Sequence, residues 1–498
     1  MFEPLKNFKN DSFDTFSLSD VKFGHRNAKM EVKLNPDFEN YYFDFNSHFR
    51  DAVLSEKFII KGRQGTGKTL LGRYIEKQAL KSPQWSCKMN SLLDYKMQEL
   101  IILQYIKPAP EELSFIWTWI QLVDLLKLLH QSKELLSEFS RDKIEHFFAE
   151  NYVTIDITPS TIVSSSLNGE INGRSLMEIL SNKNIEYKSE FSRPYLNWLP
   201  ELEAVVTKLV GECKGRFTFI YDDLDECFRD DEMFSFSLNG LAKSTFNLNE
   251  YFREKGLNVK IILLLRSDIF TPLKNPLLNK LSFSHCIYLN WGNRLDPGSP
   301  LMQMILYKVS KSTERFKDQS DFDLFYTLFP QSVTGIDPAR YLISHSLFRP
   351  RDIIAYIELM LERFSMSQYF GWKSLLETKV FYTEYFVAEL TKEMSGHIPI
   401  KAARQSIQLI RALKTPFFMF EDLQKEYRRN PDLYEYIDLE GTIYLLFSFG
   451  LIGNHWYDST TQKYHYNWAN HENKRPLDLS KKLALHVGLR DPDSIIKK

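Results

Sequence analysis

Four short apolar runs of strand length punctuate the first 300 residues, and helical patterns separate them. The runs are residues 57–61, 217–221, 259–265 and 285–289. Their apolar residues are nearly continuous rather than alternating, which is typical of parallel strands covered on both faces by helices. The pattern therefore predicts an α/β fold in which helices flank a parallel sheet.

The strand pattern stops near residue 297, and helical periodicity then dominates. Three helical stretches predict an all-helical lid, at residues 301–312, 352–364 and 380–394. Three further helical stretches follow, at residues 402–413, 421–428 and 440–449. They precede two strand-like runs at 451–457 and 463–468. Three helices followed by a hairpin is the order of a winged helix.

A chain of 498 residues is expected to form two to four domains. Within the first of them, an apolar stripe around Trp117 and Trp119 is interpreted as packed core rather than as a cofactor site. The predicted parts are an N-terminal arm packing on the core (1–50), a P-loop α/β core (51–296) with a helical insertion at about 92–195, a helical lid (297–395) and a winged-helix-like domain (396–498).

A glycine-rich segment, residues 62–69, follows the first strand and opens the next helix. Glycines let successive backbone N–H groups point into one concavity that holds phosphates, and the helix dipole adds to it. In this pattern Lys68 neutralises phosphate charge and Thr69 offers its hydroxyl to Mg²⁺. We therefore expect ATP and Mg²⁺ as cofactors, with nucleotide contacts from Gly62, Arg63, Gln64, Gly65, Thr66, Gly67, Lys68, Thr69 and Leu70.

Acidic residues follow the second apolar run at its carboxyl end, in the sequence Asp-Asp-Leu-Asp-Glu at 222–226. Asp222, first beyond the strand, is expected to hold Mg²⁺ directly or through water. Asp223 stands where a residue that polarises the attacking water is usual, and Asp225 and Glu226 compete for that role. An acidic helix N-terminus is the alternative explanation.

Two arginine motifs are further candidates for contacts to the γ-phosphate. Arg266 and Ser267 end the 259–265 run, and they would reach the phosphate if that strand lies beside both motif-bearing strands; a salt-bridged strand end is the alternative. Arg349 and Arg351 flank Pro350 at the start of a helix, where we expect both to be exposed. Either an anionic ligand or an ion pair with Asp352 or Glu358 would explain them.

Composition narrows the function classes only slightly. With 43% apolar and 26% charged residues the chain is of the globular class, and a net charge of -1 does not indicate nucleic-acid binding, although it would allow a local basic patch. Four widely spaced cysteines favour free thiols. No signal-peptide pattern and no apolar run near the roughly 20 residues of a membrane helix is visible, so we expect a cytoplasmic protein without a membrane partner.

The sequence resembles bacterial P-loop ATPases of the STAND/KAP-like branch of the AAA+ relatives. Four motifs carry the resemblance: the glycine loop, the acids at 222–226, the Arg-Ser-Asp triplet at 266–268 and the Arg-Pro-Arg-Asp motif at 349–352. The segment 23–28 is similar to the Phe-Gly segment that precedes the core in that group, near the adenine pocket, and Trp291 also fits. The resemblance covers about residues 20–360. It implies a nucleotide-driven switch, often encoded beside an effector gene in anti-phage defence.

The leading hypothesis is thus an ATPase that switches conformation, forms homo-oligomers and regulates a protein effector. The alternative is a DNA-binding, initiator-like ATPase whose winged helix contacts phosphates through Lys425, Arg428, Arg429 and Lys463, although acidic residues lie among these cations. A small-molecule kinase shares the loop but would need an acceptor pocket, which the long lid region does not favour.

Overall fold

The computed structural model describes residues 16–95, 110–152, 194–223, 232–270, 281, 284–460, 462–469 and 475–490. The chain forms two compact units. The sheet unit comprises Asp44–Asn290 and Glu393–Pro399, and the lid unit comprises Met1–Phe43, Trp291–Lys392 and Ile400–Lys498.

The sheet unit is built on a five-stranded parallel sheet with the strand order β2-β3-β4-β1-β5. Its strands are β1 (Ile59–Gly62), β2 (Trp85–Ser91), β3 (Arg216–Asp222), β4 (Val259–Arg266) and β5 (Cys286–Tyr288). Its helices are α2 (His48–Leu54), α3 (Lys68–Ala79), α5 (Pro110–Gln131), α6 (Glu138–Tyr152), α9 (Pro194–Glu212), α10 (Glu232–Glu254) and α11 (Ser267–Phe270). The predicted α/β class is confirmed.

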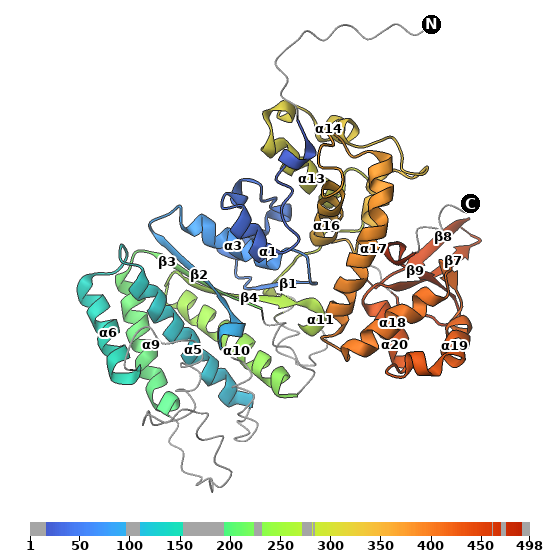
Figure 1. Cartoon of the computed structure of the whole chain (residues 1–498). Helices are drawn as coiled ribbons and strands as arrows, with labels where there is room; N and C mark the ends of the chain where they lie inside the picture. The colour runs from blue at the N-terminus through green and yellow to red at the C-terminus, as the bar shows by residue number, and fades with distance from the viewer. Residues whose placement is uncertain are drawn as a thin grey trace, which may run out of the picture. The chain divides into compact units, whose positions relative to one another are not determined.

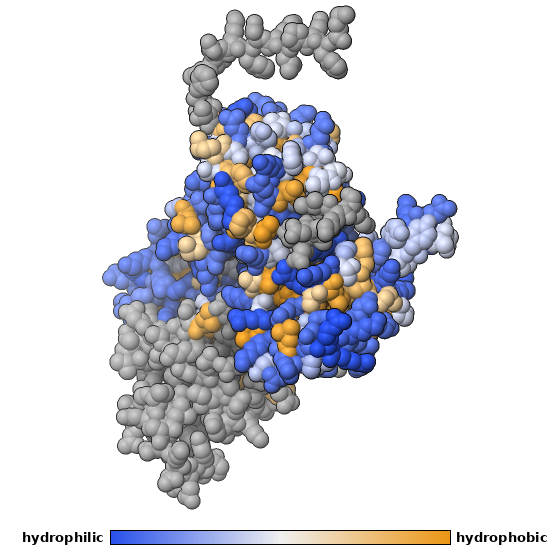
Figure 2. Space-filling view, turned by 45° about the vertical axis from the view of Figure 1, so that its right-hand side comes forward, coloured by the Kyte–Doolittle hydropathy of each residue, from blue (hydrophilic) through white to orange (hydrophobic). Residues whose placement is uncertain are grey.

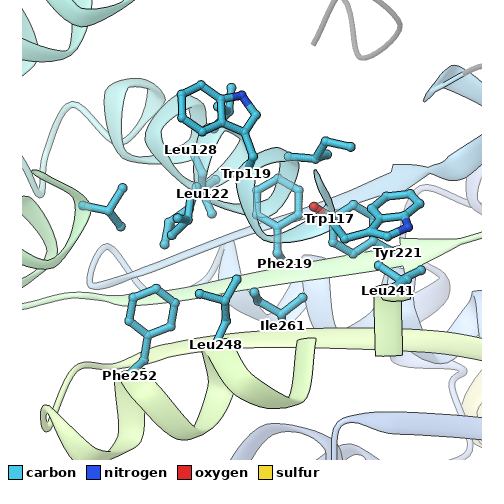
Figure 3. Close-up of a cluster of buried hydrophobic side chains, with 14 of the residues drawn as sticks. Trp117, Trp119, Leu122, Leu128, Phe219, Tyr221, Leu241, Leu248, Phe252 and Ile261 are labelled. Carbon is cyan, nitrogen blue, oxygen red and sulfur yellow. The ribbon is translucent and has the colours of Figure 1, made fainter. Parts of the chain in front are cut away.

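Helices cover both faces of this sheet, with α3 on one face and α5 and α10 on the other (Figure 1). The central strands are almost wholly buried, which explains why their apolar runs are continuous. On the α5 side, side chains from α5, β3, β4 and α10 form one core, which includes Trp117 and Trp119 (Figure 3). Both tryptophans are buried, so the prediction that this stripe is core is confirmed.

Strand β2 has no counterpart among the four apolar runs of the sequence. Trp85, Cys87 and Met89 alternate with polar residues in it, and only Met89 is fully buried. It occupies the edge of the sheet beside β3, where one side of the strand stays half-exposed. The alternation of apolar and polar residues in this segment is the sequence pattern that could have predicted the strand.

The lid unit combines the N-terminal segment, the helices of the lid region and a winged-helix-like part. Its helices are α1 (Ala28–Leu34), α13 (Pro300–Ser312), α14 (Asp321–Leu328), α15 (Pro338–Ser344), α16 (Pro350–Leu361), α17 (Trp372–Met394), α18 (Ile400–Ala412), α19 (Phe420–Arg429) and α20 (Leu439–Ser448). Only the last residues of α17, from Glu393, group with the sheet unit.

The N-terminal segment differs from its prediction as an arm on the core. Up to Phe43 it groups with the lid unit. Leu18 donates its N–H to the carbonyl of Ser367, and the ring of Phe16 lies edge-on to Phe316 at 5.0 Å. Apolar side chains such as Leu18 are buried there, so the segment is an integral layer of the lid unit's own core.

The C-terminal part has the predicted order of three helices and a hairpin. Helices α18, α19 and α20 precede the antiparallel pair β7 (Ile452–Asp458) and β8 (Lys463–Asn467). Two further strands, β6 (Phe417–Phe418) and β9 (Lys482–Leu485), complete a sheet of order β6-β9-β7-β8. These two strands are only two and four residues long, too short to leave a recognisable pattern in the sequence.

No helix among the described residues is long and apolar enough to cross a membrane. On the face drawn in Figure 2, hydrophobic residues lie in small groups among hydrophilic ones. Cys87, Cys213 and Cys286 are free thiols, and Cys227 lies outside the described residues.

Candidate functional site: a phosphate loop at the carboxyl edge of the sheet

The glycine loop connects β1, which ends at Gly62, to α3, which begins at Lys68. Gly65 and Gly67 have φ angles of 81° and 100°, and Gly67 is the left-handed N-cap of α3. Only glycine takes up these angles without strain. The two glycines therefore let the backbone turn sharply and leave the N-terminus of α3 at the end of the sheet, the arrangement of a phosphate-binding loop.

Lys68 lies inside this loop. Its Nζ donates to the carbonyl oxygens of Gly62 and Arg63 at 3.0 Å each, and its side chain is buried. The hydroxyl of Thr66 also donates to the Arg63 carbonyl, at 2.8 Å. The loop therefore holds a cation at its centre, where an ammonium neutralises bound phosphate.

Thr69 and Asp222 meet at the same edge of the sheet, as predicted for a Mg²⁺ site. The Thr69 hydroxyl donates to Oδ2 of Asp222 at 2.7 Å. Burial raises the pKa of Asp222 to about 6, with a further rise from Asp223, while the Thr69 hydroxyl and the Lys68 ammonium lower it. A nearby Mg²⁺ would reverse this shift, because a cation favours the ionised carboxylate.

A buried carboxylate beside a threonine hydroxyl is a donor set that suits a hard cation. Among the described residues no group of three or more His, Cys, Asp and Glu side chains forms a metal cluster. An ion held by Thr69 and Asp222 would therefore take its other ligands from phosphate oxygens and water, which is usual for Mg²⁺.

Asp223, the expected water-polarising residue, is held in an unusual backbone conformation. Its φ angle is 63°, in the left-handed region, and Ser91 at the end of β2 donates its hydroxyl to Oδ2 at 2.6 Å. Left-handed aspartates are uncommon and gather at functional sites. Ser91 was missed because its strand was missed. Asp225 and Glu226 lie outside the described residues.

Strand β4 lies between β1 and β3, which was the condition for Arg266 and Ser267 to approach the loop. Gly62 pairs in register with Arg266. The Arg266 side chain donates from Nε to Asp268 at 3.1 Å, so the alternative of a salt-bridged strand end is present in the structure. Its role as a phosphate sensor stays a prediction.

Residues in the last turn of α17 and in the segment just after it also contact this edge. Nε2 of His397 lies 3.0 Å from Asp268, and Arg63 of the loop lies 3.8 Å from the buried carboxylate of Glu393. Burial raises the pKa of Asp268, but hydrogen bonds from His397 and Arg266, with their charges, outweigh it and hold that pKa far below its ordinary value. These contacts join the loop and β4 to the segment that links lid and winged helix.

The prediction that Arg349 is exposed at a helix start is wrong. Arg349 and Asp352 are both fully buried, with Nε of Arg349 donating to Oδ2 of Asp352 at 2.8 Å. Arg351 is partly exposed and pairs with Glu389. Since the α16 turn encloses its own arginine, the structure supports the ion-pair explanation for Arg349 and does not support a catalytic role.

The segment 23–28, expected by resemblance near the adenine, belongs to the lid unit. Arg26 pairs with Glu358 at 3.4 Å, and the His25 N–H donates to Glu31. Trp291 lies beside Phe43 in the same unit, with ring centroids 6.3 Å apart. Adenine contacts from these residues stay a prediction.

Comparisons with known proteins give partial matches. Residues 299–391 match the FunZ-associated C-terminal helical domain. A putative transposon gamma-delta 80.3 kDa protein of Escherichia coli K12 is 22% identical over 93% of this chain, which spans just under two thirds (66%) of that relative's length.

Among solved structures, Orc1 of Aeropyrum pernix, in complex with DNA, aligns at 11% identity and a TM-score of 0.37, covering 95% of both chains. AMPPCP-bound DnaA of Aquifex aeolicus aligns at 11% identity and a TM-score of 0.30, covering 80% of this chain and 90% of its own. At these TM-scores the alignments define neither fold nor activity. The α/β unit with its glycine loop and the family match at residues 299–391 are what the structure and the comparisons establish.

Proposed function

We propose that this chain is an ATP-binding and ATP-hydrolysing switch. The observation that carries the proposal is the Thr69–Asp222 hydrogen bond at the edge where β1, β3 and β4 end, which joins the loop to the acids after β3. Loop, metal carboxylate and water-polarising acid are the parts that phosphoryl transfer to water requires.

In this proposal the loop amides and Lys68 bind the β- and γ-phosphates. Thr69 and Asp222 hold Mg²⁺, which supplies charge neutralisation on the phosphate oxygens when bound. Asp223, fixed by Ser91, accepts a hydrogen bond from the attacking water and orients it.

The contacts of Arg63 with Glu393 and of Asp268 with His397 support a switch rather than a simple hydrolase. Phosphate in the loop would compete with Glu393 for the Arg63 guanidinium, since both are anions. That competition would alter the segment leading to the winged helix. The finer proposal, a homo-oligomeric STAND/KAP-like switch with an effector encoded nearby in anti-phage defence, rests on the motif resemblance.

Replacement of Asp223 by Asn tests the catalytic assignment. Asparagine tolerates the left-handed backbone and keeps the side chain's shape, so the fold is preserved. ATP affinity should be retained while steady-state turnover falls by about 100-fold or more. Ser91→Ala should reduce turnover less. Wild-type turnover in Asp223→Asn would move the role to Asp225 or Glu226.

A second candidate is an initiator-like ATPase that binds duplex DNA. The exposed cations Lys425, Arg428 and Arg429 on α19 favour it, as does similarity to a protein named for a transposon. Against it, α20, the third helix of the module, carries a single charged residue, Glu440. Duplex affinity that falls steeply with salt and is lost in Arg428→Ala/Arg429→Ala would favour this candidate.

A further inference from the structure

One face of the β7–β8 ribbon is an exposed row of aromatic rings. Residues in register across the two strands share a face, and here His455 opposes Tyr466 while Tyr457 opposes Tyr464. By its pairing through β9, Phe417 of β6 lies on the same side. We call Phe417, His455, Tyr457, Tyr464 and Tyr466 the aromatic sheet face.

These rings contact one another; the three tyrosines are exposed to solvent, while Phe417 and His455 are half-buried. His455 stacks on Phe417 at 4.4 Å and on Tyr464 at 5.0 Å, with interplanar angles of 23° and 12°. Tyr466 lies 4.7 Å from His455. Tyr457, Tyr464 and Tyr466 are 53%, 65% and 42% exposed, far more than a packed sheet face would leave them.

At its base, the opposite side of the ribbon packs on the protein, whereas Trp456 and His465 further along that side are half-buried. Asn454 and Asn467, which pair in register on that side, are buried, and the Asn454 amide donates to the Asp478 carbonyl. The exposed rings are therefore not the result of a strand that lacks an inner face. A contiguous group of exposed rings, unlike a single exposed side chain, marks an interaction surface, so a partner for this side is indicated.

Charges on the aromatic sheet face are positive. Lys482 is exposed and pairs in register with His455, and the Arg490 guanidinium lies 5.4 Å from the Phe417 ring. Burial, followed by the charges of these two cations, lowers the pKa of His455 below its ordinary value. Asp458, the acid nearest in the strand, lies on the other side, beside His465.

We propose that the aromatic sheet face binds single-stranded nucleic acid, with bases stacked on Tyr464 and Tyr466 and phosphates beside Lys482 and Arg490. A row of rings offers every base a π-face, and cations at its margin follow the backbone. A carbohydrate would need carboxylates and amides for its hydroxyls, and paired bases in a duplex would hide the faces that the rings contact.

This proposal is independent of the ATP switch, and it differs from the duplex-DNA candidate in both surface and ligand. Its test uses the full chain at 50 mM salt without nucleotide. Fluorescence anisotropy is recorded with a labelled 20-nucleotide oligo-dT, with oligo-U, and with a duplex of equal length.

We expect the single strands to bind more tightly than the duplex. Tyr464→Ala/Tyr466→Ala should weaken this binding by about 30-fold or more, because each stacked ring contributes roughly 5- to 100-fold. The Tyr464→Phe/Tyr466→Phe pair keeps the rings and should bind like the wild type. Tyr369→Ala, at a tyrosine 60% exposed elsewhere in the lid unit, is the matched control.

Lys482→Gln should lower the slope of log affinity against log salt by about 0.7, the contribution of one phosphate contact on a single strand. Lys68→Ala should bind single strands like the wild type. The test of single-strand binding therefore does not depend on whether the ATP proposal is correct. Absence of single-strand binding, equal loss in Tyr369→Ala, or duplex binding insensitive to the tyrosine pair would overturn the proposal. So would self-association of the chain that disappears in the tyrosine pair, since a second copy would then cover the face.

Discussion

Two helix starts in this molecule each carry a cation, and the surroundings of the two cations differ. Lys68 begins α3 after the glycine loop, and Arg349 precedes Pro350 at the start of α16. Both place a cation where the helix dipole disfavours it. At α3 the ammonium donates to two neutral carbonyl oxygens of the loop, whereas at α16 the guanidinium is enclosed with a carboxylate. Of the two, the cation at the centre of the glycine loop is the one placed to contact a phosphate.

The same contrast separates two buried acids. Asp352 accepts hydrogen bonds from Arg349 and from the backbone N–H of Leu347 at 2.9 Å. Asp222 accepts hydrogen bonds from two neutral donors, the Thr69 hydroxyl and the Asp223 backbone, and burial raises its pKa to about 6. The first acid completes a structural ion pair, while the second retains a demand for positive charge that Mg²⁺ would meet.

The largest expected effect is on stability, at the buried pair. Arg349→Ala leaves the Asp352 carboxylate enclosed without its partner, so the free energy of unfolding should fall by about 3–5 kcal/mol. Chemical denaturation measures this change. The double variant Arg349→Met/Asp352→Leu should recover most of the loss, since it removes both charges. Full stability with turnover abolished in Arg349→Ala would instead return this residue to the catalytic machinery.

The next effect is on nucleotide affinity, at the loop. Lys68→Ala should weaken ATP binding by about 100-fold or more, roughly 2.7 kcal/mol, because the phosphate loses its central cation. Isothermal titration calorimetry, or the shift of Tm with Mg-ATP, reports the loss. Lys77→Ala, in the last turn of the same helix, is the control and should bind normally. Unchanged affinity in Lys68→Ala would remove the loop assignment.

Asp222 gives a pH-dependent prediction for the nucleotide-free protein. Its folded pKa of about 6 lies above the ordinary value of 3.8, so the folded state binds the proton more tightly. Asp222 therefore contributes up to about 3 kcal/mol to the free energy of unfolding below about pH 4, and this contribution is lost as the pH rises to about 6. Asp222→Asn should stabilise the free protein at pH 7–8 by about 1–3 kcal/mol. Denaturation curves that depend on pH equally in variant and wild type would contradict this.

The smallest effect is expected at Arg351. Its pair with Glu389 is partly exposed, and solvent screens such pairs, so Arg351→Ala should cost about 1 kcal/mol or less. A much larger loss, matched by lost ATP turnover, would mean that the exposed arginine of this turn does what was first expected of Arg349.

Much of the site follows from local sequence. The loop glycines, Lys68, Thr69 and the acids at 222 and 223 each sit next to a strand end, and the carboxyl ends of parallel strands meet at one edge. Ser91 could not be placed this way, because β2 is an alternating edge strand. Arg349 was misjudged since burial of a charged side chain depends on the whole lid core rather than on its own turn.

By itself, then, the sequence determined the α/β class, the phosphate loop and the winged-helix order, because these depend on period, glycine angles and strand ends within short windows. Only the tertiary structure decided that β4 separates the two motif-bearing strands, that the N-terminal segment packs in the lid unit, and that five rings, three of them exposed tyrosines, share one sheet face. Each of these depends on pairing between residues far apart in the chain, and long-range pairing is fixed by the packing of the complete core.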